Sequence, residues 1–144
     1  MSHKISTFSK GTANTHLVLR GENLMDDSTA VGVLKKAGCK FRDERDWGKF
    51  HNPKDLAVDL IIEAAELLEH FRFRSEKEIS AQLSNPQKKD EISDEMGDIL
   101  LALVLLSDCC NIDLSKAYFN KLEKTRKKYP ADKVRGKNKK YDEY

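Results

Sequence analysis

The stretch DEMGDILLALVLL, residues 94–106, decides the fold of this 144-residue chain. Its second part, 99–106, is apolar at every position, so a helix there would have to be buried on all its faces. Glu95 and Asp98 flank the start of that run at i, i+3 spacing, which places both carboxylates on one helix face. We therefore predict a long central helix that carries an acidic pair. Either the rest of the chain covers this helix on all sides, or a second subunit covers one side of it.

A second acidic pair lies in IIEAAELLEHF, residues 61–71, where Glu63 and Glu66 have the same spacing. Four carboxylates facing one another across two helices would repel, and a divalent cation bound to phosphate oxygens would relieve that repulsion. Solvated acidic pairs are common in a chain that is 35% charged, but both pairs here are embedded in apolar sequence. Neither helix contains Glu-x-x-His, which argues against a ferritin-like di-iron site. The pattern favours a magnesium site.

Start signals for helices are clear in this chain. Pro53 and Pro86 each follow an asparagine, and Asn at the N-cap with Pro at the first helical position begins a helix. Ser75 and Glu78 have the spacing of a capping box, and Asp113 can cap a later helix. No alternating Val/Ile/Thr run predicts a strand. We predict an all-α fold with helices over 28–47, 53–73, 76–83, 86–111 and 114–128.

The length is that of one domain with one core. The net charge of +2 gives no general argument for nucleic acid. Three cysteines, an odd number with two of them adjacent, argue against a disulfide framework and favour a reducing cytoplasm. The apolar run 99–106 is far shorter than the roughly 20 residues of a membrane-spanning helix. We expect a cytoplasmic protein with no membrane partner.

Three regions differ in composition. Residues 1–24 are rich in Ser, Thr and Gly and are predicted to be a disordered extension or leader. Residues 25–130 form the predicted helical domain, and 131–144 a basic C-terminal tail.

Four blocks, in their order and spacing, make the chain resemble the all-α nucleoside triphosphate pyrophosphohydrolases, or MazG-like enzymes, and among them the dCTP pyrophosphatases. The blocks are FRDERDWGKFHNPKDLA, EAAELLEHFRF, DEMGDILLALV and KLEKTRKKYP, and the resemblance covers about residues 34–141. It implies a four-helix bundle completed by homo-oligomerisation, as a homodimer or homotetramer. It also implies hydrolysis of a (d)NTP to the monophosphate and pyrophosphate.

The resemblance implies a set of site residues as well. The acids that match the family's Mg²⁺ ligands, with Mn²⁺ able to replace the magnesium, are Glu63, Glu66, Glu95 and Asp98. The residues that match its substrate contacts are Trp47, His51, Phe73, Lys121, Thr125, Arg126, Lys128 and Tyr129. Simpler explanations exist for some of them. A lone Trp is commonly a core or interface anchor, and basic residues in a last helical turn also complement the helix dipole.

Three positions depart from the dCTP pyrophosphatase pattern. Gly38 stands where that branch has a histidine near the base, Ala102 where it has a tyrosine, and Thr125 where it has an asparagine. The metal chemistry survives these changes, but selectivity for cytosine does not follow from them. We expect (d)NTP hydrolysis with a relaxed base preference that includes dCTP, as in house-cleaning of the nucleotide pool.

Two other classes of protein compete with this interpretation. Residues 126–140 hold eight Lys or Arg against one Asp, and such a run can track a phosphate backbone in a nucleic-acid-binding or regulatory helical protein. Few aromatic residues alternate with the basic residues there, and no helix-turn-helix signal is present. We therefore expect no nucleic-acid partner. The second competitor is a helical scaffold with structural acids. Metal-dependent turnover separates all three.

Overall fold

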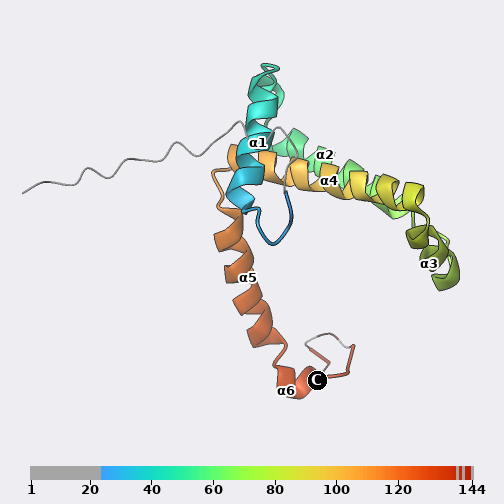
Figure 1. The fold of residues 1–144 in the computed structure, drawn as a ribbon. Coiled ribbons are helices and arrows are strands. Elements are labelled where there is room, and N and C mark those ends of the chain that lie inside the picture. The colour runs from blue at the N-terminus through green and yellow to red at the C-terminus, as the bar shows by residue number, and fades with distance from the viewer. Residues whose placement is uncertain (1–23, 139, 141, 144) are drawn as a thin grey trace, which may run out of the picture.

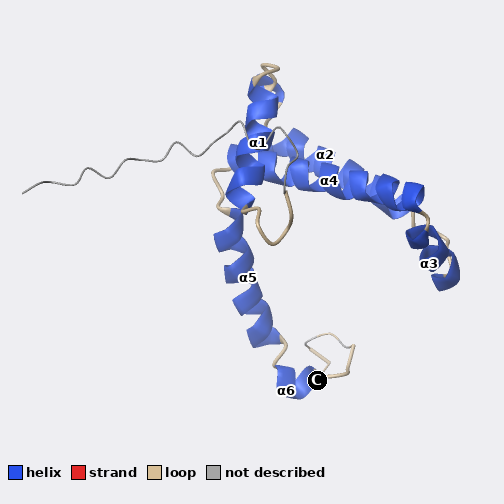
Figure 2. Cartoon of the chain, viewed as in Figure 1, coloured by secondary structure: helices blue, strands red, loops and turns tan. Residues whose placement is uncertain are grey.

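The computed structural model describes residues 24–138, 140 and 142–143. This part of the chain is helical and contains no strand (Figures 1 and 2), which confirms the predicted all-α class. The predicted extension, apart from Leu24, lies outside the described residues. The elements in order are α1 (Val31–Asp43), the 3₁₀ turn η1 (Gly48–Phe50), α2 (Pro53–Glu69), α3 (Glu76–Ser84), α4 (Pro86–Cys109), α5 (Leu114–Lys128) and α6 (Ala131–Val134).

Helix starts follow the sequence closely because side chains cap them. The Asn52 side chain accepts the N–H of Asp55 at 3.0 Å at the start of α2, and Asn85 caps α4 in the same way. Ser75 and Glu78 form the predicted capping box of α3. These caps satisfy backbone donors that the first helical turn leaves open.

Two of the helices end several residues earlier than predicted. The first helix was expected to reach residue 47 but ends at Asp43, and α2 ends at Glu69 rather than 73. In both cases a residue shortly after the helix adopts the left-handed conformation, Asp46 at φ 53° and Phe73 at φ 59°. Residues other than glycine adopt it rarely, so the sequence carried no glycine signal for these stops. At the other end, α1 begins at Val31 rather than 28, after a turn in which Ser28 bonds to the Met25 carbonyl.

The helices pack around α4. Helix α2 lies along α4 as the most extensive pair, α1 crosses α4, and α3 contacts it near its start. Helix α5 leads away from the α2–α4 pair (Figure 1). In the described part of the chain none of the helices is both long and apolar enough to cross a membrane.

One chain on its own has a small core. Among the residues that the structure describes, the buried apolar ones are Leu56, Ile92, Ala102, Val104 and Leu105. The run 99–106 is only partly covered, since Leu100 is 41% exposed. Large apolar side chains on α2, such as Ile61 at 68% exposed, are also open. The four long helices are therefore present, but α5 does not close a bundle over the others within one chain.

Candidate metal centre

Three of the predicted acids come together between α2 and α4. Glu63 and Glu66 lie on one face of α2, Glu95 lies on α4, and each offers a carboxylate oxygen within 4.8 Å of the others. Glu63 and Glu95 are half-buried and Glu66 is exposed. Asp98, one turn after Glu95, is exposed and lies outside this closest group, yet its charge acts on Glu63. The i, i+3 spacing on two packed helices thus brings three of the four predicted acids together.

The cluster is electrostatically unfavourable without a cation. The pKa of Glu63 is raised, first by burial and then by the charges of Glu66, Asp98, Asp59 and Glu95. Nearby carboxylates disfavour the ionised form of a glutamate. A divalent cation would reverse this effect, so the oxygen donors fit the hard metal ion that the sequence predicted.

Asp59 was not among the site residues predicted from the sequence, because it falls outside the family pattern. It stands outside the two acidic pairs, one turn before Glu63 on α2, and contributes to the raised pKa of Glu63. Its i, i+4 spacing to Glu63 was the available signal. Asp59 therefore belongs to the electrostatic surroundings of the cluster.

The two predicted aromatic contacts are presented at separate helix ends. Trp47 is 44% exposed, and its ring meets Phe41 edge-on with centroids 5.8 Å apart. Phe73 is 93% exposed and lies 4.8 Å below the guanidinium of Arg72. Helix α2, with 17 residues, separates the two and spans roughly 25 Å at 1.5 Å per residue. One nucleoside cannot touch both aromatics of the same chain.

His51 lies just before α2, half-buried. Its Nδ1 is buried without a hydrogen-bond partner, and its carbonyl accepts a hydrogen bond from the Cys109 thiol at 3.5 Å. A buried ring nitrogen is normally hydrogen-bonded, so the open Nδ1 of His51 is consistent with a residue that makes a polar contact to a ligand.

The predicted phosphate contacts lie on α5 and directly after it. Lys121, Arg126 and Lys128 are exposed, and Arg126 is paired with Glu123 on the same helix. Thr125 accepts the N–H of Tyr129 through its carbonyl at 2.9 Å. Because α5 leads away from α2 and α4 (Figure 1), the structure does not bring these residues to the acids of their own chain.

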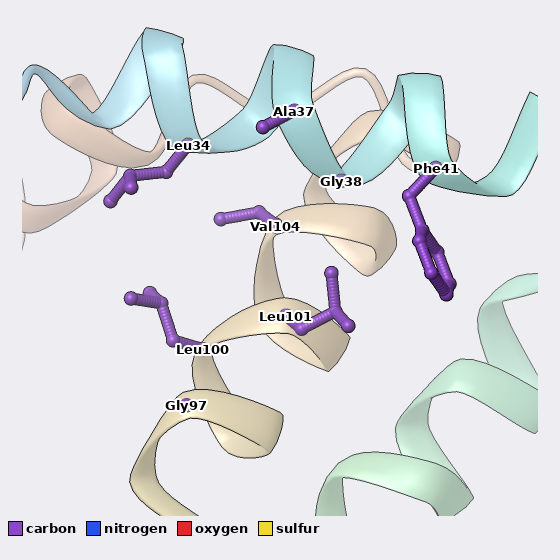
Figure 3. Close-up of a pocket in the computed structure, with 8 residues that line it drawn as sticks. All are labelled: Leu34, Ala37, Gly38, Phe41, Gly97, Leu100, Leu101 and Val104. Atoms are coloured by element: carbon purple, nitrogen blue, oxygen red, sulfur yellow. The ribbon is translucent and has the colours of Figure 1, made fainter. Parts of the chain in front are cut away.

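Gly38 and Ala102, which stand where the dCTP pyrophosphatase pattern has a histidine and a tyrosine, are both closely packed in this structure. A Cβ at Gly38 would lie 3.0 Å from Leu101 Cδ1 and 3.3 Å from Val104 Cγ2, so α1 crosses α4 at this glycine. Ala102 is 2% exposed. Beside the crossing lies an apolar cavity of about 300 Å³ (Figure 3), lined by Leu34, Ala37, Gly38, Phe41, Gly97, Leu100, Leu101 and Val104. Its α4 residues form a different stripe of the helix from Glu95 and Asp98.

Comparison with known proteins places this arrangement in a family. The family model described as MazG-like matches residues 60–144, which include both acidic pairs and α5. The chain belongs to the MazG-like family. The expected all-α class and the expected family are thus both confirmed.

Individual proteins that resemble this MazG-like chain support the same family assignment. It is 34% identical over 136 residues to dCTP pyrophosphatase 1 of Homo sapiens, covering 87% of this chain and 80% of the human protein. It is also 34% identical over 132 residues to dCTP pyrophosphatase 1 of Rattus norvegicus, covering 84% and 78%. A pyrophosphatase of Archaeoglobus fulgidus DSM 4304 superposes with a TM-score of 0.63 at 42% identity, covering 67% of this chain and 89% of the archaeal chain. The prediction of a nucleotide pyrophosphohydrolase in the dCTP pyrophosphatase-like branch is confirmed at this level.

Proposed function

We propose that this MazG-like enzyme hydrolyses deoxynucleoside triphosphates, dCTP among them, to the monophosphate and pyrophosphate with the help of Mg²⁺. The observation that carries the proposal is the group formed by Glu63, Glu66 and Glu95. The names of the relatives, dCTP pyrophosphatase, support the substrate class.

The acidic group fits a divalent cation. Glu63, Glu66 and Glu95, joined by Asp98 one turn after Glu95, would hold Mg²⁺, and Mn²⁺ accepts the same oxygen ligands. A bound divalent ion supplies charge neutralisation on the triphosphate and a lowered pKa of a bound water. A carboxylate of the group that is not fully used as a ligand can orient the water that attacks the α-phosphorus and accept its proton.

We further propose that the complete site uses two copies of the chain. The acids lie between α2 and α4, whereas Lys121, Arg126 and Lys128 lie on the distant α5. Seating α5 of a second copy near the acids would bring basic side chains to the triphosphate. It would also cover part of the open apolar surface. The predicted homodimer or homotetramer therefore belongs to the catalytic proposal.

Base selection is proposed to be relaxed. Trp47 and Phe73 offer aromatic faces, which stack on any base. Gly38 and Ala102 offer no hydrogen-bonding side chain; Gly38 packs against α4, and Ala102 is buried. Housekeeping of the deoxynucleotide pool fits this chemistry, and the three cysteines, all free, fit the predicted cytoplasmic location.

Turnover of a nucleotide panel tests the proposal. Purified protein is offered canonical and modified dNTPs and NTPs with Mg²⁺, Mn²⁺ or a chelator, and products are separated by ion exchange. We expect monophosphate and pyrophosphate from several dNTPs, and none with chelator. Diphosphate with orthophosphate would show that a different bond is cleaved. A strict dCTP profile, with other dNTPs slower by more than about a thousandfold, would show that an unrecognised group reads the base.

A further inference from the structure

The segment 44–51 joins α1 to α2 and carries Trp47 and His51. Its conformation is set where α1 ends. Asp46 is left-handed at φ 53°, the N–H of Trp47 bonds to the Arg42 carbonyl at 3.1 Å, and the N–H of Asp46 bonds to Asp43 at 3.1 Å. This is the hydrogen-bond pattern of a Schellman motif, which commonly includes an apolar contact like the one between Trp47 and Phe41. The place of Trp47 therefore follows from the place of the last turn of α1.

The side chain of Arg42 fixes that last turn to α4. Its Nη1 donates to Asp108 Oδ2 at 2.8 Å and its Nε donates to Asp43 Oδ1 at 2.7 Å. The Arg42 side chain is only 16% exposed, compared with 62% for Asp43 and 39% for Asp108. The bond to Asp108 joins two helices, whereas the bond to Asp43 stays within one. Arg42 thus connects the Trp47 turn to the last turn of α4.

Neighbouring contacts strengthen this connection. The Cys39 thiol interacts electrostatically with Asp108, and the pKa of Asp108 is lowered chiefly by its hydrogen bond to Arg42. The residue after Asp108 holds the other end of the segment, because the Cys109 thiol donates to the His51 carbonyl. Two consecutive residues of α4 therefore hold both ends of segment 44–51.

We propose that the Arg42–Asp108 pair is a positioning device that holds Trp47 in the place from which it stacks on the nucleoside. The proposal rests on the proposed function, in which Trp47 contacts substrate. Neither Arg42 nor Asp108 touches the acidic group. Loss of the pair should therefore weaken nucleotide binding and leave the hydrolytic step unchanged.

Two readouts test the pair. Trp47 is the only tryptophan of the chain, so quenching of its fluorescence by acrylamide reports the segment without any need for activity. In Arg42→Ala and Asp108→Asn we expect easier quenching and a KM for dNTP raised about tenfold, the scale of one charge-assisted hydrogen bond. We expect kcat to stay within about twofold, since binding alone is affected. Lys40→Ala, which removes the exposed ion pair between Lys40 and the C-cap residue Glu44 and leaves the link to α4 intact, and Asp43→Asn are matched controls with little expected change.

Rescue completes the test. Exchanging the charges, Arg42→Asp with Asp108→Arg, should recover part of the wild-type KM and quenching. Unchanged KM and quenching in both single variants, with helical content intact, would overturn the proposal. Unfolding of the single variants and of the exchanged pair would equally overturn it, since the pair would then be a general stabiliser. If wild-type protein turns over no nucleotide, the quenching result still decides whether the pair holds Trp47, so the two proposals fail separately.

Discussion

At the residue scale, the charge of Glu63 opposes folding. Its pKa is raised by burial and by four neighbouring carboxylates, so the ionised form is less favourable in the folded than in the unfolded state. This destabilisation is fully present above the folded pKa and disappears as the pH falls through it. A bound divalent cation removes it at neutral pH. Stability and metal binding are therefore linked through the same side chain.

Glu63→Gln should abolish most activity and raise the metal-free Tm at pH 7. The gain should vanish as the pH falls below the ordinary glutamate value of 4.5, where wild-type Glu63 is protonated as well. Added Mg²⁺ should raise the Tm of the wild type more than that of the variant. Calorimetry across pH, with Asp94→Asn on the same helix as the control, measures both effects. A lowered Tm at pH 7 would instead assign Glu63 to a structural ion pair.

Phe73 combines exposure with backbone strain. An aromatic residue at φ 59° costs about 1–2 kcal/mol relative to an ordinary conformation, and at 93% exposure it gains little from packing within the chain. Strain of this kind is typical of ligand-contacting sites. The aromatic ring is therefore better explained by a contact outside its own chain than by the fold of that chain.

Substitutions at Phe73 separate strain from binding. Phe73→Asn should be more stable than Phe73→Ala by about 0.5–1 kcal/mol, because Asn tolerates the left-handed conformation. Both should bind dNTP more weakly than the wild type. Thermal unfolding and nucleotide titration measure the two effects. Equal stability of the two variants would mean that the strain is relieved elsewhere.

At the element scale, the crossing of α1 over α4 depends on one of the two glycines of α1. A Cβ at Gly38 would meet Leu101 at 3.0 Å, whereas a Cβ at Gly32 would meet nothing within 4 Å. Glycine is a weak helix former at either position, but only the packing shows that Gly38 permits the close approach.

Gly32→Ala should stabilise the protein by about 1 kcal/mol, since alanine favours the helix and no neighbour opposes it. Gly38→Ala should lack this gain, because Leu101 must move into the adjacent cavity to make room. Gly38→His, which restores the residue of the dCTP pyrophosphatase branch, should lower the Tm. Thermal unfolding of the three variants tests the comparison. Destabilisation by Gly32→Ala would show that another copy packs on that face.

Prediction from sequence succeeded where the information was local. Helix starts were found because Asn52, Asn85 and Ser75 cap their own helices, and the acidic pairs were found because their spacing fixes their face. The ends of α1 and α2 were predicted too late because Asp46 and Phe73 adopt the left-handed conformation. A sequence indicates that conformation mainly through glycine, and neither residue is one. The position of α5, and hence the distance of its basic residues from the acids, depends on tertiary contacts that no local pattern encodes.

At the scale of the whole molecule, α5 lies far from the acids of its own chain, so two variants that are each defective should restore activity when they form a mixed oligomer. Glu63→Gln and Lys121→Ala should each be inactive or weak alone. Mixed after unfolding and refolding together, they should recover up to about a quarter of wild-type activity, because half of randomly assorted dimers are hybrids with one of two sites intact. Steady-state turnover of the mixture measures the recovery.

A second mixture provides the control. Glu63 and Glu95 belong to the same group within one chain, so a hybrid of Glu63→Gln and Glu95→Gln has no intact site and should stay inactive. Recovery in this mixture, or none in the first, would show that the acids and α5 are combined differently from our proposal.

Because the core of a single chain is small, the stability of the protein should depend on its concentration. With five buried apolar residues in the described part of the chain, a separated copy has little to hold its helices together, so most of the folding free energy would come from association. The midpoint of unfolding would then shift with the logarithm of protein concentration rather than stay constant. In a cell, the amount of this protein would set how much of it is folded as well as how many sites are present, and a modest fall in expression would remove activity more than proportionally.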